Sequence, residues 1–280
     1  MNIDAIVRRA EIVRAIRKFF DDMGFVEVET DTVIAAPAPE EHIDCPRLES
    51  GEFLRASPEL QMKKLLSAGM DRIYQIGPCF REGECGDRHN PEFTMMEWYR
   101  RDASYLDIRR DMENVMRLFR PDMEFTTLSV RDAYRRFAGW DPWKGEWDQD
   151  RFDIDMANVV EPAIGNVGGG VFLCDYPPQA ASLSKISVAN GASFAERWEF
   201  YMDGMELANC FSELCDSEEQ TRRFEKSRAA RRLLGEADYP MDYGFLESIS
   251  RIKQAAGVAL GIDRLVMVLT DIQKISAVRA

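Results

Sequence analysis

One segment of the sequence, residues 76–101, combines side chains that suit a phosphate-rich ligand. It reads IGPCFREGECGDRHNPEFTMMEWYRR, and its first half is crowded with arginine, carboxylates and glycine. Its second half is aromatic and apolar and contains Glu97. The planar donors of arginine can bond two phosphate oxygens at once, so a loop of fixed arginines is a candidate anion site. The alternative is a solvated hairpin tip, for which this loop is long and rich in arginine.

The elements that must position this segment can be predicted from residue spacing. A strand, the charged loop and a returning strand account for the segment itself. Further helices are predicted at 3–20, 57–69, 105–118, 217–234 and 242–252, and further strands at 25–30, 171–175, 195–209 (a pair turning near Gly204) and 257–262. Ser57 is expected to cap its helix, with Pro58 at the first helical position. Strands mixed with helices in this way favour an α+β fold with a largely antiparallel sheet.

We expect one domain over residues 1–280, with a less regular insertion of short helices and loops at about 121–170. The chain has 280 residues, of which 45% are hydrophobic and 30% charged, and its net charge is −13. An acidic field disfavours a nucleic-acid partner and suits a small molecule or a basic protein. No apolar run reaches the length of a membrane span and no secretory signal is visible. Six cysteines without a CxxC pair suggest reduced thiols and a cytoplasmic location.

Three blocks of the chain resemble, in order, motifs 1, 2 and 3 of the class II aminoacyl-tRNA synthetases. They read FFDDMGFVEVET, CFREGECGDRHNPEFTMMEWYR and GVALGIDRL. The residues HNPEFTMMEWY, ELANCFSEL and GIDRL are similar to lysyl-tRNA synthetases in particular. Those enzymes carry an N-terminal anticodon-binding OB-fold of roughly a hundred residues, whereas the motif 1 helix here starts almost at Met1.

A lysyl-synthetase-like catalytic domain without that OB-fold resembles the elongation factor P–lysine ligase family. That family activates (R)-β-lysine with ATP and attaches it to a lysine side chain of elongation factor P. The blocks YPPQAASLSKIS, MELANCFSEL and GVALGIDRL are like this family too. The resemblance therefore implies the class II catalytic fold, an AMP-forming amino acid–protein lysine ligase, and a homodimer.

The same resemblance assigns an ATP site in which fixed cations and magnesium stabilise charge on the phosphates. Arg81 matches the catalytic arginine expected on the α-phosphate and the substrate carboxylate, and Arg264 the one expected on the γ-phosphate. Phe93 matches the aromatic residue that stacks on adenine. The implied ATP-binding set is Arg81, Glu82, Arg88, His89, Phe93, Glu199, Glu206 and Arg264. Glu199 and Glu206 match the carboxylates that hold Mg²⁺, which needs only one or two beside phosphate oxygens.

The alternatives to these roles are ordinary ones. For the arginines they are surface salt bridges, and for the two glutamates a pair of exposed strand residues.

An amino-acid pocket is implied as well, formed by Glu59, Glu97, Tyr99, Asn209, Phe211, Glu213 and Ala259. A carboxylate at its closed end can bind the distal ammonium while an aromatic ring packs on the methylene stem. Glu59 matches a ligand of the other amine, although a helix-dipole partner is the alternative. Ala259 stands where lysyl-tRNA synthetases usually have glycine, which favours (R)-β-lysine over α-lysine; one methyl can shift preference by roughly 1–3 kcal/mol. The alternative is a small core residue without effect on specificity.

Two positions depart from the family pattern. Asp31 replaces the usual proline of motif 1, although a dimer is still expected. Gly83 falls where a nucleotide-contacting glutamate is expected, so either Glu82 or Glu84 takes that role or the adenine contact is lost. The sequence also assigns no base to the acceptor amine.

Two other functions fit the same motifs. One is a short lysyl-tRNA synthetase-like enzyme that charges tRNA or another carrier. The other is a non-catalytic regulatory paralogue.

Overall fold

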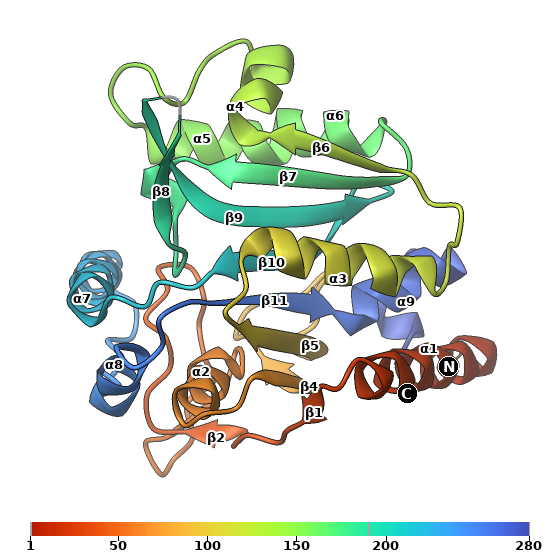
Figure 1. The fold of residues 1–280 in the computed structure, drawn as a ribbon, viewed down its shortest axis with the longest axis horizontal. Coiled ribbons are helices and arrows are strands. Elements are labelled where there is room, and N and C mark those ends of the chain that lie inside the picture. Colours follow the sequence, from red (N-terminus) through yellow and green to blue (C-terminus); the bar gives the residue numbers. More distant parts are fainter. Residues whose placement is uncertain (1, 190, 280) are drawn as a thin grey trace.

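The computed structural model describes residues 2–189 and 191–279 and is built around one mixed sheet (Figure 1). Its strands are, in spatial order, β1 (Val26–Glu27), β4 (Arg72–Phe80), β5 (Glu92–Arg101), β11 (Ala255–Gly261), β10 (Met205–Ser212), β9 (Ala192–Met202), β7 (Gly170–Tyr176) and β6 (Phe125–Ser129), with β8 (Ile186–Ala189) beside β9. Only the outer pairs β1–β4 and β6–β7 are parallel among these described strands. The predicted α+β architecture with a mainly antiparallel sheet is confirmed.

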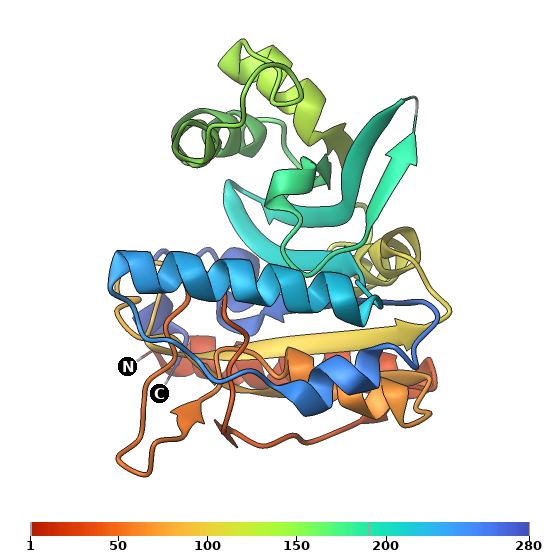
Figure 2. The same cartoon turned by 90° about the vertical axis from the view of Figure 1, so that its left-hand side faces the viewer.

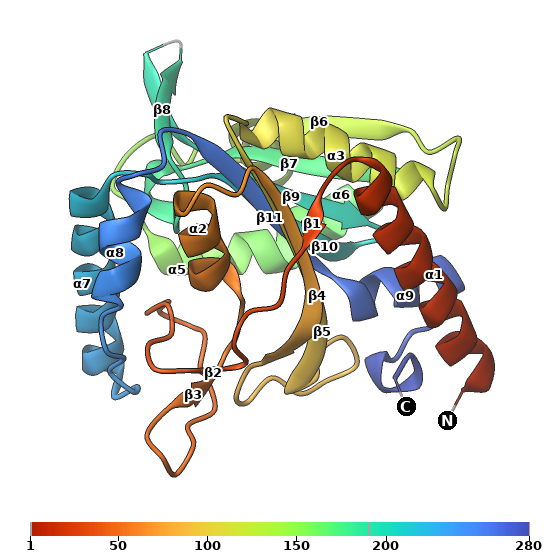
Figure 3. The ribbon, with the colours of Figure 1, turned by 60° about the horizontal axis from the view of Figure 1, so that its bottom comes forward.

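Three helices cover one face of this sheet and form the main core with it. They are α1 (Ile3–Asp22), α3 (Tyr105–Arg117) and α9 (Ile262–Thr270). Ile12, Ile16 and Phe20 recur at four-residue spacing, which places them on one side of α1. Phe20 packs edge-on against Trp98 of β5, with ring centroids 5.1 Å apart. Figure 3 shows that both chain termini lie beside α1 and α9.

The other side of the sheet carries a second group of helices. They are α2 (Glu59–Ser67), α7 (Ser217–Leu234) and α8 (Tyr243–Ile249). Figure 2 shows α7 running across this side of the molecule with α8 below it. A small hairpin, β2 (Val33–Ile34) and β3 (Phe53–Leu54), lies between β1 and α2 in the chain. None of the helices in the described part of the chain is long and apolar enough to cross a membrane.

Residues 121–170 fold more regularly than predicted. They contain the short helices α4 (Val130–Ala133), α5 (Gln149–Asp155) and α6 (Glu161–Gly165), linked by π-helical turns at residues 134–138 and 156–160. Tyr134 and Phe152 stack within their own apolar cluster, which packs against β7 and β9. Strand β6 was not predicted, and it extends the main sheet beyond β7. The division into one domain with an insertion remains a prediction.

Several predicted boundaries were wrong. The strand expected at residues 25–30 ends at Glu27, because the amide of Thr30 donates to the side chain of Gln75 at 3.0 Å instead of continuing the backbone ladder. Helix α2 begins at Glu59 and not at Pro58. Helix α8 ends at Ile249, three residues before the predicted end.

Candidate active site

The pairing register of the four central strands aligns several predicted site residues. Glu97 of β5 pairs with Ala259 of β11, which pairs with Asn209 of β10, which pairs with Glu199 of β9. Directly paired residues project from the same face of a sheet. We call these four residues the site row. The sheet therefore brings together four of the predicted site residues that are far apart in the sequence.

This face is opposite the main core because side chains alternate along a strand. On β5, Met96 and Trp98 are fully buried against the core helices, while Glu97 and Tyr99 project the other way. The next row on the site face contains Tyr99, Gly257 and Phe211. A Cβ on Gly257 would lie 2.1 Å from the ring of Tyr99, so only glycine leaves room for that ring.

A cavity of about 480 Å³ opens over the site row. Most predicted site residues line it, and they come from α2, from β5 and the loop before it, from β9 to β11, and from α9. They are Glu59, Arg81, Arg88, His89, Phe93, Glu97, Glu199, Glu206, Asn209, Phe211, Ala259 and Arg264. Glu82, Tyr99 and Glu213 do not line the cavity. The volume and the donor types suit a charged ligand of substantial size.

At one end of the cavity, Glu97 is held in a fixed orientation although it is only 1% exposed. The hydroxyl of Ser57 donates to its Oε1 and the hydroxyl of Tyr99 to its Oε2, each at 2.6 Å. Burial, together with the carboxylate of Glu59, raises the pKa of Glu97 to about 7. A buried carboxylate without a cation is costly, so this end favours an ammonium group.

The two neighbouring carboxylates already have a cation. Nζ of the buried Lys63 contacts both Glu59 and Glu213. Burial opposes the charge on Lys63, but Glu213 and Glu59 outweigh it and raise the pKa of the lysine. Glu213 is thus a partner of Lys63 behind the cavity wall, not a direct part of the wall, which corrects its expected position. Sequence reasoning missed Lys63, although its place four residues after Glu59 puts the two on one helix face.

Arg81 lines the cavity beside an aromatic ring. Its guanidinium carbon lies 5.1 Å from the centroid of Phe93, and Nη1 lies 3.4 Å from Oε1 of Glu84. Nε of Arg81 is buried without a hydrogen-bond partner among the described residues. A buried donor left unpaired is expensive, which points to a ligand oxygen at this position.

Glu82 and Glu84, the two candidates for the adenine contact, differ in their placement. The side chain of Glu82 is exposed and outside the cavity, whereas Glu84 lines it. Between them, Gly83 has a φ of 78°, where a larger side chain would be strained. This geometry explains why glycine stands in the FREGE segment, and it favours Glu84 for the nucleotide contact.

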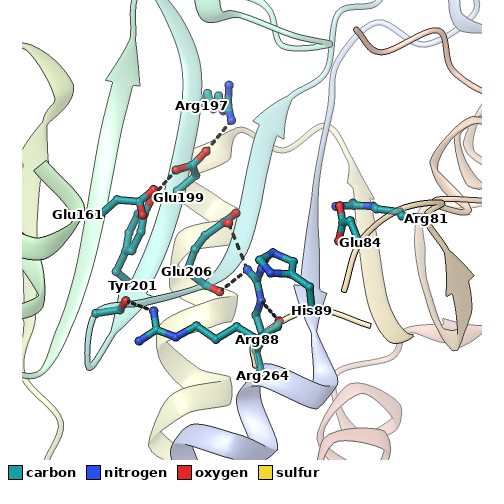
Figure 4. A network of polar contacts seen from close by, with 11 residues as sticks. Arg81, Glu84, Arg88, His89, Glu161, Arg197, Glu199, Tyr201, Glu206 and Arg264 are labelled. Carbon is teal, nitrogen blue, oxygen red and sulfur yellow. Dashed lines mark hydrogen bonds and ion pairs between the residues drawn. The ribbon is translucent and has the colours of Figure 1, made fainter. Parts of the chain in front are cut away.

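At the other end, three basic side chains form a connected cluster around Arg264 (Figure 4). Arg264 donates from Nη1 to the backbone oxygen of Glu206 at 3.0 Å, and its Nη2 lies 2.6 Å from Nε2 of His89. Arg88 donates to the backbone oxygen of Gly204 at 3.1 Å. Burial and the charge of Arg264 lower the pKa of His89. The two arginines of the cluster supply the positive charge that a polyphosphate requires.

Glu199 and Glu206 line the cavity from β9 and β10, and Oε2 of Glu206 lies 3.3 Å from Nη1 of Arg264. Glu199 accepts hydrogen bonds from Arg197 at 2.5 Å and from the hydroxyl of Tyr201 at 2.6 Å (Figure 4). Burial and the charge of Glu199 raise the pKa of Glu206 to about 7. Two carboxylates that repel each other fit a divalent cation that also binds phosphate oxygens. Arg197 was not predicted, although its position two residues before Glu199 places it on the same strand face.

Residues 2–280 match the protein family described as tRNA synthetases class II (D, K and N). The chain is 34% identical to the elongation factor P–(R)-beta-lysine ligase of Proteus mirabilis over 311 residues, covering 100% of this chain and 95% of that protein. It is 36% identical to the ligases of the same name from Photorhabdus laumondii and Yersinia enterocolitica, with 98% of this chain and 94% of each relative covered.

Proposed function

The chain belongs to the class II tRNA synthetases of the D, K and N type, and from this premise we propose that it is an ATP-dependent ligase for a lysine-type amino acid. It activates the amino acid, (R)-β-lysine in our proposal, as an adenylate and transfers it to a lysine side chain of elongation factor P. The observation that carries the proposal is sequence identity of 34–36% to ligases with this activity in their names, over nearly their whole length. The cavity supports it with a carboxylate at one end and arginines at the other.

In the first step, the amino-acid carboxylate attacks the α-phosphate of ATP, and pyrophosphate leaves. Glu97 binds one ammonium of the amino acid, and Glu59, held by Lys63, binds the second. Asn209 and Arg81 orient the carboxylate, with Phe211 packed along the methylene stem. Donors fixed before the reaction stabilise developing charge without reorganising.

The nucleotide occupies the remaining length of the cavity. Phe93 stacks on adenine, Glu84 contacts its edge, and Arg264, Arg88 and His89 bind the β- and γ-phosphates. A magnesium ion held by Glu199 and Glu206 would neutralise phosphate charge during the transfer. Tyr201 and Arg197 keep Glu199 oriented for that role.

In the second step, the ε-amine of the acceptor lysine attacks the mixed anhydride and AMP leaves. The net charge of −13 disfavours tRNA as the acceptor. We also propose that the enzyme is cytoplasmic and forms a homodimer. Sedimentation at assay concentrations tests the oligomeric state.

One assay tests the whole proposal. The protein is incubated with ATP, Mg²⁺ and either (R)-β-lysine or α-lysine, with elongation factor P or tRNA(Lys) as acceptor. We expect pyrophosphate release and a mass increase of elongation factor P by one β-lysyl group. Transfer to tRNA alone would instead favour a lysyl-tRNA synthetase-like enzyme, and no pyrophosphate release with any amino acid would favour a regulatory paralogue.

A further inference from the structure

A loop at the rim of the cavity, residues 40–44, is fixed from behind by a buried arginine. Arg231 of α7 is fully buried, and its Nη1 donates to the backbone oxygens of Glu40 at 2.8 Å and Ile43 at 3.1 Å. Its Nη2 donates to the carboxylate of Asp44 at 2.5 Å. The amide of Glu82, in the arginine-rich loop, donates to the backbone oxygen of Asp44 at 2.7 Å. The loop backbone is therefore attached to both α7 and the ATP-binding segment.

Glu40, on this fixed backbone, is one of the residues that line the cavity. It is partly buried, and within the described residues its carboxylate has neither a hydrogen bond nor an ion pair. Burial, followed by the charge of Glu59, raises its pKa. The charged and titratable groups around it come from α2, from the loop after β4, from β9 and from its own loop: Glu59, Lys63, Arg81, Arg197, Glu41 and His42.

The proposed reaction involves more amines than Glu97 and Glu59 can bind, which suggests a role for Glu40. The proposed function brings three amines into one cavity, two from β-lysine and one from the acceptor lysine. Glu97 and Glu59 are available for the first two, on β5 and α2. Glu40 is one of the remaining carboxylates that line the cavity, and Arg81, which orients the reacting carboxyl group, is among the charges that act on it.

From this placement we infer that Glu40 binds the acceptor amine and acts as the general base of the transfer step. The inference rests on the proposed function. The ammonium of the acceptor gives one proton to the carboxylate of Glu40, and the neutral nitrogen then attacks the carbonyl carbon of the adenylate. A C–N bond forms, the bond from the carbonyl carbon to the phosphate oxygen breaks, AMP leaves with that electron pair, and the second amine proton passes to solvent.

The test separates the two chemical steps in Glu40→Gln. Adenylate formation is measured by ATP–pyrophosphate exchange with β-lysine. Transfer is then measured from preformed adenylate to two nucleophiles: hydroxylamine, which is largely neutral at pH 7 and needs no base, and the side chain of Nα-acetyl-lysine amide, which is an ammonium. Glu49→Gln is the matched control, because Glu49 is exposed, belongs to the same connection between β2 and β3, and is outside the cavity.

We expect Glu40→Gln to leave exchange and transfer to hydroxylamine within about twofold of wild type. Transfer to the lysine amine falls about 100-fold, in the range for loss of a general base, and its rise with pH through the pKa of Glu40 disappears. Glu49→Gln changes none of these rates.

Three results would overturn the inference. Loss of exchange in Glu40→Gln would make Glu40 a ligand of the amino acid, and unchanged transfer to the amine would leave it no role as a base. Loss of amine transfer in His42→Gln but not in Glu40→Gln would move the role to His42. A wild-type protein without exchange contradicts the proposed function itself and is thereby distinguished from a failure at Glu40.

Discussion

The hydroxyl of Tyr99 donates a hydrogen bond to Oε2 of Glu97 at 2.6 Å, although Tyr99 itself does not line the cavity. The two residues are two apart on β5, so both project from the site face of the sheet. Tyr99 therefore acts on the substrate through Glu97, by favouring the ionised form of its carboxylate. This relationship makes the pH dependence of amino-acid binding a test of the site.

Replacing Tyr99 by phenylalanine is expected to shift that pH dependence upward. Glu97 binds an ammonium only when ionised, so the KM for β-lysine in wild type falls as pH rises through about 7, the pKa of Glu97. Without the hydrogen bond the pKa rises further, and KM at pH 7 increases roughly tenfold, as for loss of a hydrogen bond to a charged group. Pyrophosphate exchange from pH 6 to 9 measures this. Tyr243→Phe, at an exposed tyrosine of α8, is the control, and an unshifted profile for Tyr99→Phe would contradict the role.

Arg264→Ala is expected to reduce adenylate formation by about 10²- to 10³-fold, the range for removing a donor that stabilises transition-state charge. The variant also releases His89 and the backbone oxygen of Glu206 from their contacts with the guanidinium. Burst measurements of pyrophosphate release report the effect. Arg251→Ala removes an exposed arginine paired only with Glu247 in the described structure and serves as the control. Activity of Arg264→Ala within twofold of wild type would refute its assignment.

Glu206→Gln is expected to weaken the dependence of the reaction on magnesium without unfolding the protein. The substitution keeps the shape of the side chain and removes one of two carboxylate charges. The Mg²⁺ concentration for half-maximal exchange then rises roughly tenfold, or about 1.4 kcal/mol. Glu218→Gln, on the exposed start of α7, controls for general charge effects. The same magnesium midpoint in wild type and Glu206→Gln would exclude Glu206 as a ligand.

Ala259→Gly is expected to improve the use of α-lysine relative to β-lysine. Ala259 lies between Glu97 and Asn209 in the site row, so its methyl group faces the part of the cavity assigned to the amino acid. A methyl in such a pocket changes discrimination by roughly 1–3 kcal/mol. The ratio of kcat/KM for the two substrates is the measurement, and it cancels any effect on the amount of folded enzyme. A constant ratio would reduce Ala259 to a packing residue.

The elements and the motif residues could largely be predicted because they follow local patterns. Hydrophobic periodicity and turn residues locate β4, β5 and α7 closely, and motif spelling identifies Arg81 and Arg264 without a structure. Strand β6 was missed because only its pairing with β7, more than forty residues away, reveals it. The same limit applies to the site row, since strand register is a long-range property.

The residues that sequence reasoning missed act through partners. Lys63 and Arg197 matter because each holds a site carboxylate, and Glu40 because Arg231, nearly two hundred residues later, fixes its loop. The sequence spacing of Lys63 and Arg197 was a partial signal. Residues four apart on a helix, or two apart on a strand, lie on the same face, so each could have been placed beside its site carboxylate. Nothing local marks Glu40 within its proline-rich loop.

The spacing between neighbouring strands also fixes the distances between the residues of the site row. Glu97 and Glu199 are separated by three strand spacings of about 4.8 Å each, or roughly 14 Å across the sheet. The backbone hydrogen bonds between the strands set that distance. Replacing a side chain changes the contacts at one end of the row and leaves the distance between the two ends unchanged. Variants of Glu97 or Glu199 are therefore expected to change the affinity for the amino acid or for magnesium without changing the distance between the two binding positions.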